Sequence, residues 1–314
     1  MEKNSLIYVA GHTGLIGSAL VRKLQGDGFK NLILKTHDDL DLTDTLAVDT
    51  FFKDIKPDYV FLAAGRVGGI VENKTYPADF ININLAIQLN VMNAAHRYDV
   101  KRLVMFGSSC MYPRECPQPM PEDYLLTGKP EPTSMAYAMA KLVGVEMCLA
   151  YNRQFGEKRF IPIIPNSAYG PNDNFNPDAG HVLSVLIRRF HEAKLNNDES
   201  ITLWGTGAPR REFIHADDIA DAAVSLMYST DIEQTDFPIN VGVGIDYSIK
   251  ELALTIADIV GYHGEIKWDT TKPDGAPRKL LDSSRISSLG WKSNKPFEQG
   301  LKETYQWYLN NAAQ

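Results

Sequence analysis

Short apolar runs alternate with amphipathic stretches along the first half of the chain. A short apolar run is typical of a strand buried in a sheet, whereas apolar positions three or four apart are typical of a helix with one buried face. This pattern predicts strands at residues 6–10, 31–34, 59–63, 103–106 and 160–164, and helices at residues 16–25, 46–53, 81–98 and 136–155. Strands that alternate with helices form βαβ units, so we expect a parallel sheet.

The second half of the chain is less regular. After a loop rich in Asn, Asp and Pro, the pattern predicts helices at residues 181–193, 217–228, 249–260 and 297–310, and strands at residues 202–204 and 238–241. We therefore predict an α/β fold, with a Rossmann-type doubly wound parallel sheet and a smaller C-terminal α/β substrate-binding domain. The expected boundaries are 1–165 for the NAD(P)-binding domain and 166–314 for the substrate-binding part, and the chain can return to the first domain around 212–242.

The composition is that of a globular protein with a large core. Of the 314 residues, 44% are hydrophobic, and 32 basic residues against 39 acidic ones give a net charge of −7. Because no run of Lys or Arg stands out, nucleic acid is not an expected partner. The N-terminus lacks the features of a signal peptide, and no stretch approaches the roughly 18 apolar residues of a membrane helix. We therefore expect a cytoplasmic protein with no membrane partner.

The cysteines do not indicate a disulfide framework or a metal site. Cys110, Cys116 and Cys148 are few and irregularly spaced, unlike the cysteines of disulfide scaffolds and zinc sites. Each is expected to be a free thiol, and no metal is expected.

A glycine turn follows the first predicted strand and opens the first predicted helix. It reads Gly11, His12, Thr13, Gly14, Leu15, Ile16 and Gly17. Glycines permit a tight turn and close backbone approach, and a helix N-terminus offers N–H groups and a positive dipole to a pyrophosphate. A tight turn without a ligand is the alternative. The position at the first βα junction favours a dinucleotide site.

The end of the second predicted strand carries no carboxylate. An Asp or Glu there would bind the ribose 2′-hydroxyl of NAD, but this chain has Lys35, Thr36 and His37. A basic or neutral site suits a 2′-phosphate better, so NADP(H) is the expected cofactor, while Asp38 and Asp39 leave NAD(H) as an alternative. The other expected cofactor contacts are Asp41, Leu42, Ala63, Ala64, Gly65, Tyr137, Lys141, Pro165, Ala168 and His181.

A tyrosine and a lysine share one face of a predicted helix. Tyr137 and Lys141 are four residues apart, and a nearby ammonium favours the phenolate and lowers the tyrosine pKa. Tyr137 could then exchange a proton with a substrate oxygen. A solvated surface pair is the alternative. Ser108 argues against that alternative, because it follows the apolar strand LVMFG at the carboxyl edge of the sheet, where ligands bind.

Two further residues are candidates for proton transfer to and from carbon. Cys110 lies two residues beyond Ser108, and His181 begins a predicted helix. A thiol beside a carbonyl-bearing sugar can act as a base on an acidified C–H bond if neighbouring groups stabilise the thiolate. A buried inert cysteine and an exposed histidine at a helix start are the alternatives, and the residues alone leave both interpretations open.

Several segments resemble the GDP-L-fucose synthase family of extended short-chain dehydrogenase/reductases, across nearly the whole chain. They are AGHTGLIGSAL, GSSCMYP, EPTSMAYAMAKLVGVEMC, YGPNDNF, GHVLSVLIRRFHEA, WGTG, RREFIHADDIAD and KPDGAPRKLLD. The resemblance implies an NADP-dependent reductase with epimerase activity. Such an enzyme inverts C3 and C5 of a GDP-4-keto-6-deoxy sugar, reduces C4 and forms a homodimer through long helices.

The resemblance also implies roles for individual residues. Ser108, Tyr137 and Lys141 match the reductase triad, while Cys110 and His181 match the base and acid of epimerisation. The expected substrate contacts are Ser108, Ser109, Cys110, Asn166, Ser167, Arg189, Trp204, Arg211 and Lys279. An arginine suits a diphosphate because its guanidinium can bind two oxygens at once.

The chain departs from the family pattern at several positions. Where the family reads P-T-N-L-Y-G-P, Ser167 stands at the position of the usual asparagine, and Asn166 lies one place earlier. Where arginines are usual in the glycine turn and after the second strand, this chain has His12 and His37. Related GDP-4-keto sugars, such as a colitose precursor or a heptose, are therefore alternative substrates. A plain C4 reductase, a sugar 4-epimerase and a non-catalytic nicotinamide-binding sensor are alternative functions.

Overall fold

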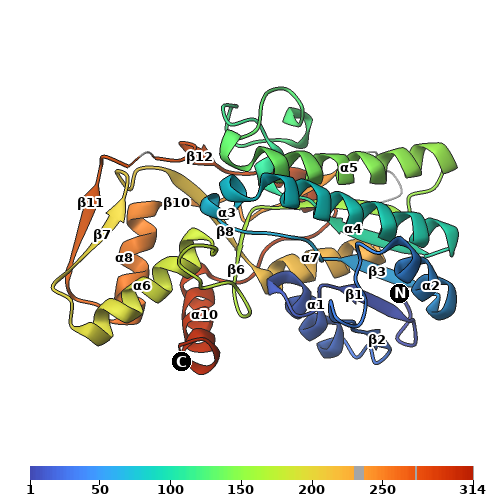
Figure 1. The fold of residues 1–314 in the computed structure, drawn as a ribbon, viewed down its shortest axis with the longest axis horizontal. Helices are drawn as coiled ribbons and strands as arrows, with labels where there is room; N and C mark the ends of the chain where they lie inside the picture. Colours follow the sequence, from blue (N-terminus) through green and yellow to red (C-terminus); the bar gives the residue numbers. More distant parts are fainter. Residues whose placement is uncertain (230–236, 273, 314) are drawn as a thin grey trace.

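A parallel sheet forms the centre of the computed structural model, which describes residues 1–229, 237–272 and 274–313. Residues 230–236 of the predicted return segment and residue 273 of the KPDGAPRKLLD motif lie outside the described residues. The strand order in the sheet is β2 (Leu32–Ile33), β1 (Ile7–Ala10), β3 (Tyr59–Leu62), β4 (Arg102–Phe106), β5 (Phe160–Pro165) and β9 (Ile239–Val241) (Figure 1). The predicted doubly wound parallel sheet is confirmed.

Helices cover both faces of this sheet because successive strand residues point to opposite sides. On one face, Val9 packs in a cluster with α1 (Leu15–Gly26) and α7 (Ala216–Tyr228). On the other face, Tyr8 packs in a cluster with α2 (Thr45–Ile55), α4 (Pro77–Arg97) and α5 (Met135–Phe155). Figure 1 shows α4 and α5 side by side above the sheet.

The C-terminal part packs around its own apolar cluster, to one side of the parallel sheet (Figure 1). Its helices are α6 (Val182–Asn196), α8 (Ile249–Val260) and α10 (Phe297–Asn311). In its main sheet, β8 (Arg210–His215) pairs with β6 (Ser167–Tyr169), β10 (Asp246–Ser248) and β12 (Arg278–Lys279). A second pair joins β7 (Ser200–Trp204) to β11 (Glu265–Asp269). The short helix α9 (Ser284–Ser288) brings Ile286 back to the cluster around β1.

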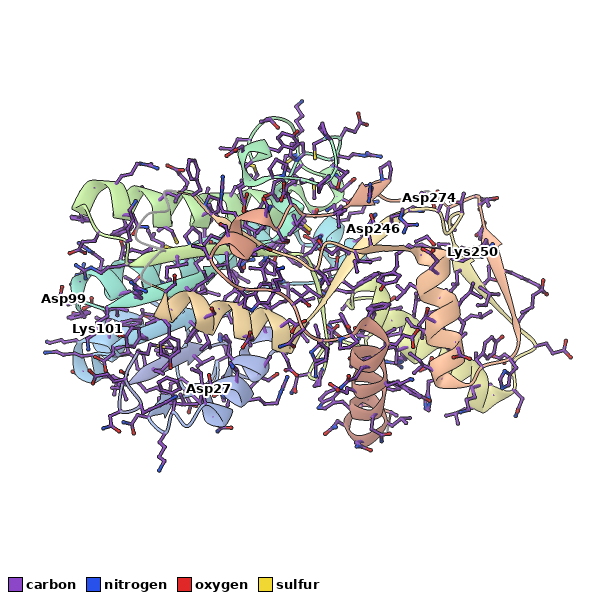
Figure 2. All side chains as sticks on the ribbon, turned by 180° about the vertical axis from the view of Figure 1, so that it is seen from behind. Asp27, Asp99, Lys101, Asp246, Lys250 and Asp274 are labelled. Carbon is purple, nitrogen blue, oxygen red and sulfur yellow. The ribbon has the colours of Figure 1, made fainter. Side chains whose placement is uncertain are left out.

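A group of ion pairs joins neighbouring strands of the C-terminal sheet that contains β8. Asp246 accepts hydrogen bonds from Arg278 and, at 2.8 Å, from the Nε of Arg210. Figure 2 shows Asp246 on the C-terminal part of the molecule. The carboxylate thus joins β10 to β8 and β12.

The structure differs from the sequence-based expectation in its short and polar elements. The helix expected at 81–98 begins earlier, at Pro77, because proline at the first helical position needs no N–H partner. Helix α3 (Ile70–Thr75) and strands β6, β8, β10, β11 and β12 were not predicted. These strands are short or carry charged side chains, so the apolar pattern does not reveal them.

None of the described helices combines the length and the apolar character that a membrane-crossing segment needs.

A buried carboxylate connects the two parts of the chain. The side chain of Glu212 in β8 accepts hydrogen bonds from the backbone N–H groups of Val243, Gly244 and Leu281 at 2.6, 2.6 and 3.0 Å, and from the side-chain amide of Asn166. Glu212 is fully buried, and burial raises its pKa. The donors lie in the segments that follow β5, β9 and β12. One side chain therefore holds three separate segments of the chain together.

We expect Glu212→Ala to lower the free energy of unfolding by about 3–5 kcal/mol, because it leaves several buried donors without an acceptor. Urea unfolding followed by circular dichroism measures this change. The exposed Glu199 serves as a matched control, since Glu199→Ala should change stability by less than about 0.5 kcal/mol. Equal effects of the two substitutions would contradict the role assigned to Glu212.

Candidate active site

A cavity of about 850 Å³ opens at the carboxyl ends of β1, β3 and β4. The chain order reverses here, because β1 pairs with β2 on one side and β3 on the other. Open α/β sheets bind ligands at such a switch point. The far wall is formed by the loop before α6 and by residues 165–168.

Most of the sequence-predicted site residues line this cavity. They are Gly11, Thr13, Gly14, Leu15, Ile16, Gly17, Thr36, His37, Asp41, Leu42, Ala63, Ala64, Gly65, Ser108, Ser109, Cys110, Tyr137, Pro165, Asn166, Ser167, Ala168 and His181. The predicted residues outside this lining are His12, Lys141, Arg189, Trp204, Arg211 and Lys279. The last two lie close behind Cys110, whereas Arg189 and Trp204 belong to the region around β7.

The glycine turn has the shape that a pyrophosphate needs. Gly11 has a φ of +81°, and a Cβ on it would lie 2.7 Å from the backbone nitrogen of Ala64. A Cβ on Gly17 would lie 2.0 Å from the carbonyl oxygen of Gly11. Gly14 is the N-cap of α1 and has no side chain to satisfy the first amides of that helix. These amides can therefore donate to an anion, so the residues fit a dinucleotide.

A mixed group of charges lines the cavity just after β2, beyond the glycine turn. Lys35, Thr36 and His37 line the cavity there, with Asp41 close to His37 at 3.9 Å. Asp39 is held by the backbone N–H and hydroxyl of Thr36 at 3.1 and 2.8 Å, which lowers the Asp39 pKa. Lys35 and a protonated His37 offer positive charge to a 2′-phosphate, while the carboxylates counter it.

Ser108 and Tyr137 lie together at the end of β4. Their side chains are within hydrogen-bonding reach, and the Ser108 hydroxyl also accepts the backbone N–H of Cys110 at 3.2 Å. Lys141 follows Tyr137 by one helical turn in α5. Its ammonium is 5.9 Å from the centre of the Tyr137 ring and donates a hydrogen bond to the carbonyl of Phe106 at 3.0 Å. A short strand end and the first turns of α5 therefore assemble the expected triad.

Burial sets the protonation of this pair. It raises the pKa of Tyr137 well above its ordinary value, with a further rise from Cys110 and an opposing hydrogen bond from Ser108. Burial also lowers the pKa of Lys141 to about 8. The predicted lowering of the tyrosine pKa by the lysine is therefore wrong, because desolvation of the phenolate dominates. Tyr137 is held as a neutral proton donor, which is the form that reduction of a carbonyl requires.

Cys110 lies between the cavity and two cations. Lys279 in β12 and Arg211 in β8 are register partners, so their side chains project from neighbouring strands. The Lys279 ammonium is 3.9 Å from the Cys110 sulfur, and Arg211 interacts electrostatically with the same thiol. Both cations therefore lie beside the thiol at the edge of the cavity.

His181 lies at the end of the loop between β6 and α6, and it lines the same cavity. It is the N-cap of α6, as predicted, and its side chain is exposed. The lining of the cavity also includes Arg66, Glu72 and Asp173, which the sequence analysis did not identify. The loop motif that contains Asp173 was available as a signal, but its spacing alone does not tell which polar residue faces the cavity.

The remaining predicted substrate residues lie farther out. Arg189 is half-buried, donates to the carbonyl of Thr202 at 2.7 Å, and has a pKa lowered by burial. Trp204 is exposed on β7, and the Lys272 ammonium lies 5.6 Å from its ring centre. These side chains offer a guanidinium and an aromatic surface beyond the main cavity.

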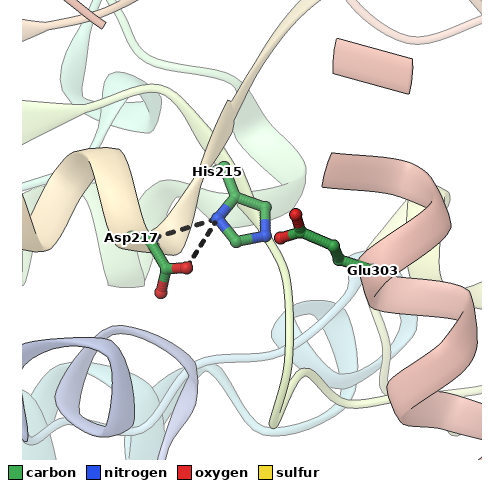
Figure 3. Close-up of side chains that lie close together, drawn as sticks. All are labelled: His215, Asp217 and Glu303. Atoms are coloured by element: carbon green, nitrogen blue, oxygen red, sulfur yellow. Dashed lines mark hydrogen bonds and ion pairs between the residues drawn. The ribbon is translucent and has the colours of Figure 1, made fainter. Parts of the chain in front are cut away.

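A second group of titratable side chains lies away from this cavity, where α7 begins near α10. Figure 3 shows the buried His215 between Asp217 and Glu303. The Lys295 ammonium is 2.8 Å from Glu303 and 3.9 Å from Asp217, so a cation already sits between the two carboxylates. The group is an ion-pair network that joins α7 to α10, and it does not need a metal ion.

Comparisons with known proteins agree with this architecture. Residues 7–242 match the NAD dependent epimerase/dehydratase family. The chain is 53% identical to putative GDP-L-fucose synthase 2 of Arabidopsis thaliana, over 100% of this chain and 94% of that protein, and 48% identical to GDP-L-fucose synthase of Escherichia coli K12, over 97% of each. A GDP-mannoheptose C4 reductase from Campylobacter jejuni, solved with NADP bound, is 44% identical, with a TM-score of 0.90 over 98% of this chain and 99% of the other.

The match covers the glycine turn, the triad and the strand that carries Glu212, and the relatives align along the full chain. The chain therefore belongs to the NAD-dependent epimerase/dehydratase family, as a full-length relative of the GDP-L-fucose synthases.

Proposed function

We propose that this protein acts as a GDP-L-fucose synthase, which inverts C3 and C5 of a GDP-4-keto-6-deoxy-D-mannose and then reduces C4 with NADPH. The observation that carries the proposal is the meeting of Ser108 and Tyr137 with Cys110 and His181 in one cavity beside the glycine turn. A reductase alone needs the first two residues. The thiol and the imidazole supply the proton acceptor and donor that inversion at carbon requires.

The reductive step uses side chains held by β4 and α5. When bound at the glycine turn, NADPH supplies the hydride that C4 accepts. The Tyr137 hydroxyl donates its proton to the C4 oxygen, and the Ser108 hydroxyl orients that oxygen by a hydrogen bond. Lys141 lies within reach to compensate the phenolate that forms, and the edge-to-face contact of Tyr137 with Phe80 keeps the ring in place.

The inversion steps use the acidity that the keto group gives to C3 and C5. The Cys110 thiolate removes a proton from carbon, an S–H bond forms, and the electron pair moves into the enolate. His181 then donates a proton to the same carbon and becomes neutral. Each inversion leaves Cys110 protonated and His181 deprotonated, so both groups exchange with water before the second one.

The GDP end of the substrate is assigned to the cationic side chains beyond Cys110. Arg211 and Lys279 lie nearest to the thiol, and Arg189 lies farther along the C-terminal part. A diphosphate between these groups leaves the sugar ring at Cys110.

A second candidate is C4 reduction of a GDP-linked heptose without inversion. The 44% identity to a GDP-mannoheptose C4 reductase favours it. Incubating the purified protein and NADPH separately with GDP-4-keto-6-deoxy-D-mannose and a GDP-4-keto heptose, with products identified by NMR, distinguishes the two. Reduction of the heptose alone would overturn the main proposal.

We also propose a cytoplasmic homodimer. Large apolar side chains are exposed on the paired helices α4 and α5, including Leu89, Met139, Val143 and Phe155. A second copy packed against these helices would bury them in a four-helix interface.

The proton-donor role of Tyr137 predicts a specific defect. Tyr137→Phe keeps the ring and its packing but removes the hydroxyl, so the rate of C4 reduction should fall at least ~10²-fold. Stopped-flow absorbance of NADPH measures the rate, and NADPH fluorescence should show unchanged cofactor binding. Reduction at a near-normal rate would rule out Tyr137 as the proton donor.

The role of Cys110 predicts that the two half-reactions separate. Cys110→Ser replaces the thiol with a hydroxyl that is far harder to deprotonate, so inversion should fail before reduction does. In D₂O the unmodified protein should place deuterium at C3 and C5, whereas the variant should give a reduced sugar that keeps the D-manno configuration with little label. A fully inverted, doubly labelled product at the normal rate would show that Cys110 is only a packing residue.

The side chain at position 37 predicts a cofactor preference. His37→Arg supplies a permanent positive charge and a two-pronged donor beside the site for the 2′-phosphate, so the ratio of NADPH to NADH affinity should rise. Fluorescence titration with each cofactor measures this ratio. An unchanged ratio in this variant would contradict the assignment of His37 to the 2′-phosphate.

A further inference from the structure

Glu72 is a cavity-lining carboxylate that the reaction scheme does not use. It lies in α3, is half-buried, and lines the same cavity as Ser108, Tyr137 and Cys110. A carboxylate accepts hydrogen bonds through two oxygens, yet no group in the described part of the chain donates to this one. A bound ligand can therefore supply the donor.

A basic residue that also lines the cavity is engaged elsewhere. The Arg66 guanidinium is 3.1 Å from the carboxylate of Asp79 and lies over the ring of Phe80, 5.2 Å from its centre. Asp79 and Phe80 both belong to the first turn of α4, so these contacts hold Arg66 against that helix. Among the described residues, the Glu72 carboxylate is thus left without a counter-ion.

Short contacts place the Glu72 carboxylate in the same corner of the cavity as Tyr137. A Cβ built on Gly68 would lie 2.0 Å from one carboxylate oxygen of Glu72 and 3.1 Å from the ring of Phe80. Phe80 in turn meets the ring of Tyr137 edge to face, with the ring centres 6.2 Å apart. The carboxylate and the proposed proton donor to the C4 oxygen are therefore both neighbours of one aromatic ring.

The turn before α3 is fixed in place. The buried side-chain amide of Asn73 donates to the carbonyls of Gly68 and Gly69 at 2.9 and 3.0 Å. The backbone N–H of Gly69 donates to the carbonyl of Ala179 at 2.8 Å, in the loop that ends at His181. This contact brings the start of α3 to the segment that carries the proposed proton donor to carbon.

The charge of Glu72 limits which part of a ligand can lie beside it. A carboxylate attracts hydrogen-bond donors and repels phosphates. The phosphates of the cofactor and the substrate are assigned to the glycine turn and to the cations beyond Cys110, so the sugar ring is the part that remains. With the C4 oxygen at Tyr137, the neighbouring ring carbons are C3, which bears a hydroxyl, and C5, which bears a methyl group. Of these two substituents, only the C3 hydroxyl can donate.

We propose that Glu72 is a specificity-determining residue that accepts a hydrogen bond from the C3 hydroxyl of the sugar, so that the site selects 3-hydroxylated GDP-4-keto sugars over 3-deoxy sugars. This inference rests on the proposed function, because it places the C4 oxygen at Tyr137. A 3-deoxy ligand would cover the carboxylate without offering it a donor, and an unpaired polar group in a closed site weakens binding strongly. Glu72 takes no part in proton or hydride transfer.

The direct test compares the binding of two stable ligands. GDP-mannose and GDP-3-deoxymannose differ only in the C3 hydroxyl, and neither carries a keto group that NADPH could reduce. In isothermal titration calorimetry of the full-length protein saturated with NADPH, GDP-mannose should bind at least ~10-fold more tightly than the deoxy ligand. In Glu72→Ala this preference should fall below about threefold, through weaker binding of GDP-mannose.

Two further variants make the test specific. Glu72→Gln keeps the length and one acceptor oxygen but removes the charge, so its preference should lie between those of the unmodified protein and Glu72→Ala. Asp178→Ala removes a carboxylate from an exposed position outside the cavity lining and should leave the preference unchanged. Alanine favours a helix more strongly than glutamate does, so Glu72→Ala should fold.

Turnover gives the second readout. With GDP-4-keto-6-deoxy-D-mannose, kcat/KM for NADPH oxidation should fall at least ~10-fold in Glu72→Ala, whereas with the 3,6-dideoxy analogue it should change by less than about threefold. Equal losses with both sugars would overturn the inference, because a general structural defect would produce them.

The inference is also overturned if the unmodified protein binds the two stable ligands equally, or if Glu72→Ala keeps the full preference. Weaker NADPH binding in Glu72→Ala with an unchanged sugar preference would assign the carboxylate to the nicotinamide instead. Failure of the proposed function has a different signature. A protein that does not convert the keto sugar would still show the difference between the two stable ligands and its loss in Glu72→Ala.

Discussion

The fully buried Glu212 carboxylate is the interaction on which the arrangement of the site depends. Its oxygens accept hydrogen bonds from chain segments that follow β5, β9 and β12, so the parallel sheet and the C-terminal sheet share one acceptor. The residue before it in β8 is Arg211, and the register partner of Arg211 is Lys279. The carboxylate thereby fixes the strands that bring both cations to Cys110. Burial raises the pKa of this carboxyl, and the aligned donors at its acceptor positions oppose that rise.

Desolvation also disfavours the charged form at the triad, where fewer donors oppose it. At Glu212 several hydrogen bonds counter the effect of burial, whereas at Tyr137 the hydrogen bond with Ser108 does so. The phenolate is therefore disfavoured, and so is the charged form of Lys141. For a reductase the neutral phenol is the useful form, since it carries the proton that the carbonyl oxygen accepts when negative charge develops there.

The sequence predicts those parts of the molecule that depend on apolar periodicity. The strands around β1, β3, β4 and β5 and the helices that cover them follow from it, and the glycine turn and Tyr137 can then be placed at the sheet edge. Strand β8 cannot be found in this way, because its first three residues are charged and long-range pairing stabilises it. The pKa direction of Tyr137 was mispredicted for a related reason. Spacing along a helix gives the neighbouring lysine, but it does not give the degree of burial. Asp173 was missed because only the folded loop shows which of its polar residues faces the cavity.

The two half-reactions are supported by different kinds of structure. Ser108 follows β4 directly and Tyr137 and Lys141 lie in α5, whereas His181 lies where a loop joins α6. Catalytic groups on regular elements are held more exactly than groups on loops, and loops tolerate more change. With the roles proposed above for Cys110 and His181, this division gives a physical reason why GDP-L-fucose synthases and a GDP-mannoheptose C4 reductase can share one scaffold.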